Sequence, residues 1–198
     1  MDQNINDNPI SKRFNERYEL LDENIKKELE KLDESDPKEY QLQVIKRKRI
    51  LPQKGDVFLV SPRKDLFFKG VVVNSNISNI NGEELLLIFI LKNKKNKSGE
   101  IYDLTDVSEL LIAPVMVGRE YWTRGYFYNT GENIEIPSEI DYGFYSIGKG
   151  MFMDEYGNEI VREPELLGTF GVATITGVSY EINVELIIDK TLNRNFYS

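Results

Sequence analysis

Any chemistry performed by this chain would have to rest on carboxylates and a few other side chains, because its 198 residues include no histidine and no cysteine. The lack of histidine excludes a Ser-His-Asp triad, an imidazole zinc site and a histidine general base. The lack of cysteine excludes a thiolate nucleophile, a thiolate-bound structural zinc and a disulfide framework. Catalysis would therefore depend on Asp, Glu, Lys, Arg, Tyr, Ser or Thr.

The densest group of carboxylates surrounds a predicted tight turn over residues 154–159. Asp154, Glu155 and Glu159 could hold a divalent cation, since hard cations prefer several oxygen ligands, but the stretch lacks the ligand spacing of an EF-hand loop. Gly157 suits the positive φ of a hairpin turn. A solvated turn is the favoured interpretation, a contact with a protein partner comes second, and a metal site is the least favoured.

If a partner binds here, the contact residues should lie in or beside the predicted turns of the acidic C-terminal half, where their carboxylates are expected to be solvated. The predicted partner-binding residues are Asp141, Asp154, Glu155, Tyr156 and Glu159. The stretch Gly148-Lys149-Gly150 lacks the glycine spacing of a phosphate-binding loop, and no G-x-S-x-G nucleophile motif occurs. We predict no catalytic residue, no cofactor and no metal ligand.

The aromatic stretch 121–128 is the other candidate contact surface, and we predict that it forms a strand. In a strand, alternate side chains share a face; one face would carry Trp122, Arg124, Tyr126 and Tyr128. Aromatic and arginine side chains are common in binding hot spots. The only tryptophan of a small β domain more often packs in its core, so a core position is the favoured interpretation.

The helices that must support these residues are predicted at the start of the chain. Apolar residues recur at steps of three or four over residues 10–33, which predicts an amphipathic helix with Asn8 as its cap. The order Asp36-Pro37-Lys38-Glu39 is that of a capping box. It predicts a second helix over residues 37–49, and residues 1–8 are predicted to be disordered.

Short apolar runs bounded by turn residues predict strands after Pro52. Residues 85–91 are apolar throughout, which predicts a strand that is covered on both faces. Residues 178–188 fit a strand or a helix, and their length and glutamate content favour a helix. A polar loop is predicted over 74–82, a charged loop over 92–99 and a short helix over 103–110. The main predicted strands are 55–60, 67–73, 84–91, 111–117 and 121–128.

This order of elements predicts an α+β fold. An N-terminal helical segment precedes a mostly antiparallel, barrel-like β-sheet domain with a candidate C-terminal helix. We divide the chain into an N-terminal helical extension, residues 1–51, and a β-rich domain, residues 52–198. A chain of this length accommodates such a division, since domains commonly span roughly 100–200 residues.

Charge is spread unevenly along the chain, whose formal net charge is −8. Residues 101–198 hold 16 acidic and 6 basic side chains. Such an excess repels phosphate backbones and attracts cationic partners. We therefore expect a basic protein partner and no nucleic acid, although residues 46–49 form a local basic run.

The start of the chain lacks the basic-then-apolar order of a signal peptide. Its longest apolar run, residues 85–91, is far shorter than the ~20 residues that a membrane helix needs. We therefore expect no membrane association and a cytoplasmic location.

A succession of single glycine, acidic and aromatic positions resembles the immunity protein 26 family over about residues 52–190. The positions that carry the resemblance are Lys54-Gly55-Asp56-Val57-Phe58, Leu111–Pro114, Trp122-Thr123-x-Gly125-Tyr126-Phe127, Asp154–Glu159, Pro164 and Leu167-Gly168-x-x-Gly171. The resemblance implies a bacterial protein that neutralises the toxin of a polymorphic toxin system. Some members carry a phosphotriesterase label, but known metal phosphotriesterases rely on histidine-rich sites, which this chain lacks.

Three functional hypotheses follow. The favoured one is an immunity protein that binds and neutralises a cognate, basic toxin domain without catalysis. The alternative is a small carboxylate-dependent hydrolase of the phosphotriesterase type. The third is a general interaction module whose helical arm serves in oligomerisation.

Overall fold

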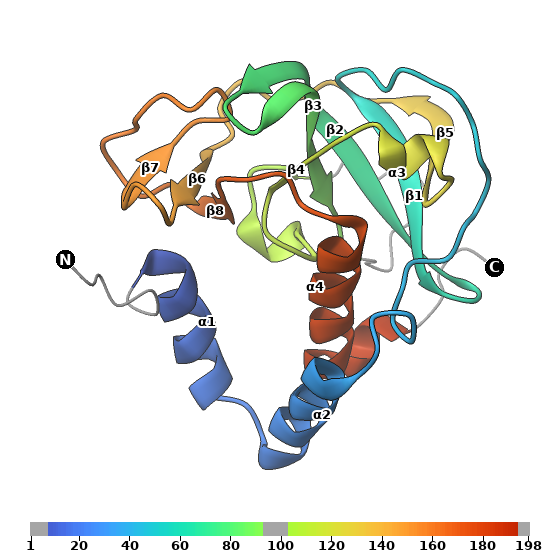
Figure 1. Cartoon of the computed structure of the whole chain (residues 1–198), viewed down its shortest axis with the longest axis vertical. Coiled ribbons are helices and arrows are strands. Elements are labelled where there is room, and N and C mark those ends of the chain that lie inside the picture. Colours follow the sequence, from blue (N-terminus) through green and yellow to red (C-terminus); the bar gives the residue numbers. More distant parts are fainter. Residues whose placement is uncertain (1–7, 93–102, 194–198) are drawn as a thin grey trace.

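The computed structural model describes residues 8–92 and 103–193 and confirms the α+β class (Figure 1). The main sheet has five antiparallel strands in the order β4-β3-β2-β1-β5: β1 Asp56–Arg63, β2 Leu66–Asn79, β3 Gly82–Ile90, β4 Val115–Val117 and β5 Phe127–Asn133. It is open at β4 and β5, so the expected barrel does not close. The predicted charged loop at 92–99 lies almost wholly outside the described residues, as do residues 1–7.

A smaller sheet has the order β7-β6-β8, with β6 and β8 parallel. Its strands are β6 Tyr142–Ser146, β7 Met151–Met153 and β8 Leu166–Thr169. The mostly antiparallel pairing that the sequence predicts is therefore confirmed.

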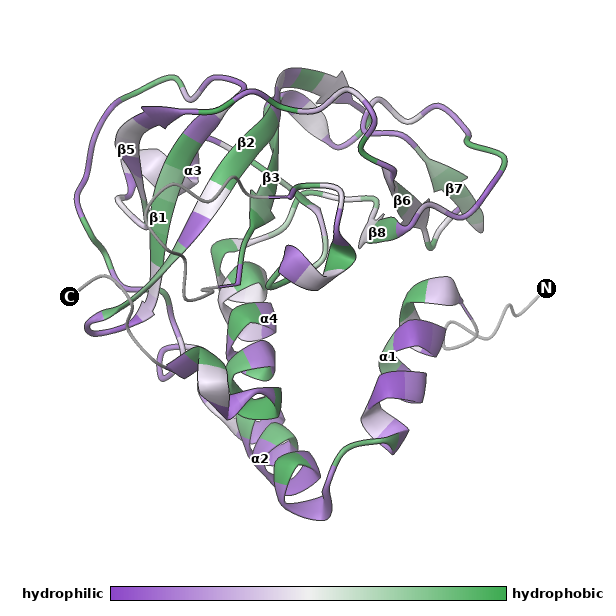
Figure 2. Cartoon of the chain, turned by 180° about the vertical axis from the view of Figure 1, so that it is seen from behind, coloured by the Kyte–Doolittle hydropathy of each residue, from purple (hydrophilic) through white to green (hydrophobic). Residues whose placement is uncertain are grey.

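Both faces of the main sheet are buried, as the apolar run 85–91 predicts, and Figure 2 shows that β2 and β3 are mostly hydrophobic. Alternate residues of each strand point to opposite faces: Ile88 packs in the core on one side of β3 and Phe89 in the core on the other. The first core includes Val178 and Ile182 of α4 (Ile175–Ile188), which confirms the predicted C-terminal helix. The second core includes Phe144 of the smaller sheet. The main sheet is thus the middle layer of three.

The first predicted helix exists but is interrupted, so the expectation of one continuous helix over 10–33 is wrong. Asn8 caps α1 (Pro9–Glu19), as predicted, by accepting a hydrogen bond from the Ser11 backbone nitrogen. Asp22 has extended backbone angles and begins α2 (Glu23–Glu34) in a new direction. The turn lets α2 lie along α4 while α1 projects beneath the smaller sheet (Figure 1).

One side chain of α4 and one of the 3-10 turn that follows it contact α2. The Tyr180 hydroxyl donates a hydrogen bond to Asp33, and the Lys190 ammonium pairs with Glu28. Lys190 begins the final 3-10 turn, Lys190–Asn193. The proposed boundary between residues 51 and 52 stays a prediction, although these contacts join its two sides.

The expected helix over 37–49 is wrong. The Asp36 carboxylate accepts from the Lys38 nitrogen, two residues on, and so closes a turn instead of capping a helix. Residues 41–50 then have no regular secondary structure; the Gln43 nitrogen donates to the Ser61 oxygen of β1 and the Ile45 nitrogen to the Gly125 oxygen. Gly125 has φ +87°, and a Cβ there would lie 2.8 Å from the Arg47 nitrogen. Hydrogen bonds between this segment and distant residues therefore prevail over the capping-box pattern at residues 36–39, which favours a helix.

Two further expectations are wrong in detail. Residues 74–79 belong to β2 and are not part of a loop, because Ile77 is buried and bulges in the pairing with β3 let the polar neighbours turn outward. The aromatic stretch 121–128 is not one strand. It begins in the short helix α3 (Glu120–Thr123), and β5 starts only at Phe127.

The remaining sequence signals mark shorter elements than expected. Val107–Glu109 forms a 3-10 turn, and β4 occupies only Val115–Val117 of the strand predicted over 111–117. Among the helices of the described residues, none combines the length and apolar character that a membrane span requires.

Candidate binding site

A cavity of about 930 Å³ is lined by α1, α4, β8 and the segments 112–115 and 171–173. In Figure 1, α1 and α4 lie on opposite sides below β8. The volume of the cavity falls in the range of roughly 300–1,000 Å³ that is typical of ligand sites. Elements from the start, the middle and the end of the chain therefore form its walls.

Helix α1 is held in place by polar contacts more than by packing, since none of its residues is buried. Arg13 donates to the Glu163 carboxylate (2.9 Å) and to the backbone oxygens of Pro164 (3.1 Å) and Glu165 (3.0 Å). These contacts join the beginning of α1 to the segment before β8. Helix α1 therefore forms a wall of the cavity and is held by polar contacts, with few apolar contacts to the rest of the chain.

A second arginine of α1 reaches across to α4. Arg17 forms a two-pronged contact with the Glu185 carboxylate, with nitrogen–oxygen distances of 2.5 and 2.7 Å. Planar arginine–carboxylate pairs of this kind are the strongest ion-pair geometry in proteins. This pair spans the cavity and fully occupies the Glu185 carboxylate.

Glu181 lies one helical turn before Glu185 and lines the same cavity. It forms no hydrogen bond or ion pair with any described residue, although water in the cavity can reach it. The surrounding protein disfavours its charged form and the charge of Glu185 adds to the effect, which raises the pKa of Glu181 from 4.5 to about 7. An acidic group with this pKa beside a cavity is a marker of functional sites.

The rest of the lining is largely apolar. Its apolar members include Ile10 and Phe14 of α1, Leu167 of β8, Val184 of α4 and Val172, which precedes α4. Phe14 is 49% exposed, which is unusual for an aromatic side chain on the inner face of a helix. The cavity therefore combines an apolar surface with one unpaired carboxylate.

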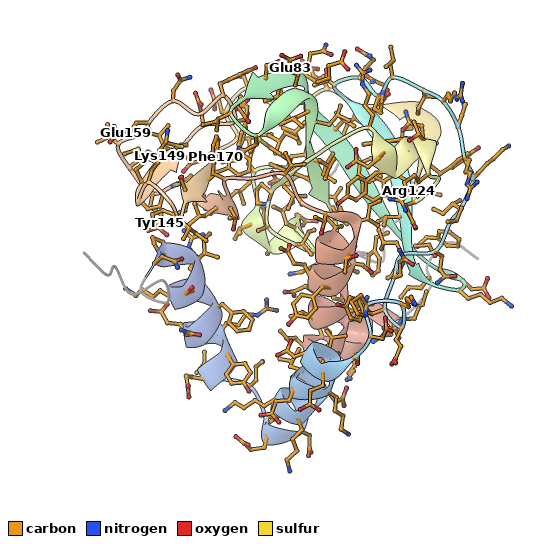
Figure 3. The ribbon with its side chains drawn as sticks, in the orientation of Figure 1. Glu83, Arg124, Tyr145, Lys149, Glu159 and Phe170 are labelled. Carbon is orange, nitrogen blue, oxygen red and sulfur yellow. The ribbon has the colours of Figure 1, made fainter. Side chains whose placement is uncertain are left out.

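The five residues predicted to bind a partner lie elsewhere, on the lobe formed by the smaller sheet, and Figure 3 labels one of them, Glu159. Glu159 is exposed at the outer edge of this lobe. Tyr156 is 49% exposed, but its hydroxyl accepts from the Asn74 amide (3.0 Å). Asp154 holds the predicted turn, because its carboxylate accepts from the backbone nitrogens of Tyr156 and Asn158.

The expectation that all these carboxylates are solvated is wrong for Glu155, which is 6% exposed. Its carboxylate accepts from the Asn74 amide and the Tyr142 hydroxyl, both at 2.7 Å, and its backbone oxygen accepts from Asn79 at 2.7 Å. The bulged end of β2 supplies both asparagines. Glu155 therefore anchors the turn to the main sheet.

Asp141 is also engaged within the chain. Its carboxylate pairs with Arg162 at 2.7 Å, and this hydrogen bond holds the pKa of Asp141 below its usual value. In the described part of the chain, no group of three or more acidic side chains is arranged to hold a metal ion. Of the four carboxylates among the five predicted residues, only that of Glu159 has no hydrogen-bond or ion-pair partner among the described residues.

Truncating Glu155 should therefore destabilise the protein, and truncating its neighbour Glu159 should not. Glu155→Ala leaves the half-buried Tyr142 hydroxyl without its acceptor and removes one of the two acceptors of the Asn74 amide, which we expect to lower the free energy of unfolding by roughly 1–3 kcal/mol. Glu159→Ala changes an exposed side chain and should alter it by about 0.5 kcal/mol or less. Urea denaturation of both variants tests this, and equal stability would remove the anchoring role of Glu155.

Sequence analysis did not identify the cavity residues. The available signal was the pair Glu181 and Glu185, four residues apart in an otherwise mainly apolar helix. That pattern places two carboxylates on one helical face, but the wall opposite comes from α1, about 170 residues earlier in the chain.

Comparisons with protein-family models, curated proteins and solved structures find no match to this chain.

Proposed function

We propose that this chain is a cytoplasmic immunity-type protein that binds and neutralises a cognate bacterial toxin domain without catalysing a reaction. The main support from the structure is the unpaired Glu181 carboxylate in an apolar cavity. Glu181 is accessible in the free protein, so a cationic group that enters the cavity can pair with its carboxylate, and the exclusion of water on binding would strengthen that pair. The resemblance to the immunity protein 26 family points in the same direction.

The charge distribution supports a basic partner. The acidic excess of residues 101–198 attracts a cationic surface over distances beyond direct contact. Charges at the rim of an interface mainly raise the association rate. Exposed Glu159 suits this long-range role, whereas the cavity suits the close contact.

The test begins with the genes that flank the coding sequence of this chain. A flanking toxin domain produced alone should stop the growth of a bacterial host, and co-production of this chain should restore growth and yield a complex that co-purifies. A flanking metabolic operon, or a toxin that kills equally in the presence of this chain, would contradict the proposal.

A carboxylate-dependent hydrolase is the second candidate, and one observation favours it. A pKa near 7 is what a general base needs at neutral pH, and Glu181 has such a value. Purified protein should then hydrolyse p-nitrophenyl phosphotriesters or esters, and Glu181→Gln should abolish the activity. Activity that meets both conditions would replace the binding proposal.

A further inference from the structure

We infer that the cavity between α1 and α4 receives a lysine or arginine side chain from a partner segment with apolar flanking residues, and that the Glu181 carboxylate accepts this cation. The inference rests on the proposed function, because it names the part of the partner that the cavity takes. It follows from the charge, the size and the walls of the cavity.

Charge selects a single cationic group. The charged side chains of the lining are Arg17, Glu181 and Glu185. Arg17 and Glu185 neutralise each other through their two-pronged contact, so Glu181 remains as one uncompensated carboxylate. A divalent metal ion would need several oxygen ligands, whereas an ammonium or guanidinium group can be held by one carboxylate.

The size of the cavity calls for more than one side chain. A volume of about 930 Å³ is at the upper end of the range for drug-sized ligands, roughly 300–1,000 Å³. Most of the remaining surface is apolar, from Ile10 and Phe14 on one wall to Val184 on the other. A basic residue between apolar ones would fill this space and bury both kinds of surface.

The walls permit entry of a partner segment. Because α1 buries no side chain, the apolar side chains on this wall, such as the half-exposed Phe14, are accessible to a partner segment. The inner helix α4 contributes Val178 and Ile182 to the core, so the wall that carries Glu181 is fixed.

A displayed library of random heptapeptides, selected on the purified full chain at about pH 8, tests the inference, since Glu181 is then largely ionised. The enriched peptides should share a lysine or arginine between apolar residues. The best peptide should then be synthesised with lysine and with Nε-acetyl-lysine. We expect the charged form to bind at least about tenfold more tightly, because acetylation removes the cation from a buried pair.

Two matched variants assign this preference to the cavity. Glu181→Gln should lose the difference between the charged and the acetylated peptide, and Glu159→Gln, with the same change of charge on the outer lobe, should keep it. Absence of enrichment, enrichment without basic residues, or unchanged binding by Glu181→Gln would each overturn the inference.

The outcome separates this inference from the proposed function. If this chain restores growth against the toxin but the peptide results fail, the toxin binds at another surface and the proposed function stands. If the basic peptides bind as expected but the chain gives no protection against a flanking toxin, the cavity inference stands and the immunity function fails.

Discussion

Trp122→Ala should lower the free energy of unfolding by roughly 3–5 kcal/mol, the usual cost of removing a large aromatic side chain from a core. Trp122 is 1% exposed and packs edge-on against Phe58 and Phe127, with ring centroids 5.3 and 5.1 Å away. The burial confirms that this residue belongs to the core. The loss is a large share of a typical total stability of about 5–15 kcal/mol.

The indole also holds a half-buried polar network. Its nitrogen donates to the Asn129 oxygen at 2.7 Å, and the Asn129 amide donates to Asp56 at 2.9 Å. Trp122→Phe keeps most of the volume but removes the donor, so its loss should be smaller, about 1–3 kcal/mol. Thermal and urea unfolding measure both variants, and a Trp122→Ala protein that melts like the wild type would contradict this role.

Glu181→Gln should stabilise the free protein and weaken its binding to the partner. Because the pKa of Glu181 is raised from 4.5 to about 7 on folding, the folded state binds more protons than the unfolded state between these values. Stability contributed by this group is then present below about pH 4.5 and is lost as the pH rises to about 7. The glutamine variant avoids that loss.

The size and pH range of this effect provide the check. Water reaches Glu181 in the cavity, so we expect a gain of only about 1–2 kcal/mol for the variant at pH 8 and almost none near pH 4. The other titratable or charged groups that face it are Arg17 of α1, Tyr121 of α3, and Tyr180 and Glu185 of α4. Urea denaturation across this pH range should show the difference, and Glu159→Gln should show none.

Binding should change in the opposite direction. Removing one member of a buried, hydrogen-bonded charge pair weakens a complex by about tenfold or more. A variant that is more stable but binds less well cannot be explained by unfolding. If Glu181→Gln binds as tightly as the wild type, this carboxylate does not contact the partner.

The sequence predicts those parts of the fold in which local pattern and tertiary packing agree. The apolar run 85–91 becomes a strand covered on both faces, and Asn8 caps α1 as its position before Pro9 suggests. The segment 37–49 shows the opposite case. Its capping signal is local, but its backbone forms hydrogen bonds to Ser61 and Gly125, which are distant in the sequence.

The candidate site was harder to predict for the same reason. The turn around Gly157 follows from its composition, but the burial of Glu155 depends on Asn74 and Tyr142, which no local pattern connects to it. Glu181 lacks an ion-pair partner because Arg17, the arginine that lines the cavity, pairs with Glu185 instead. The number of charged residues identifies the acidic half of the chain. Which of its carboxylates have no hydrogen-bond or ion-pair partner depends on tertiary contacts that the sequence does not reveal.

Hydrogen–deuterium exchange on the complex with a co-purifying toxin domain tests most directly whether the partner occupies the cavity between α1 and α4. We predict slower exchange in α1 and residues 169–173 on binding, with little change in the turn at 154–159. The same experiment with Glu181→Gln should need a higher toxin concentration for equal protection. Protection confined to residues 154–159, or none in α1, would contradict the account.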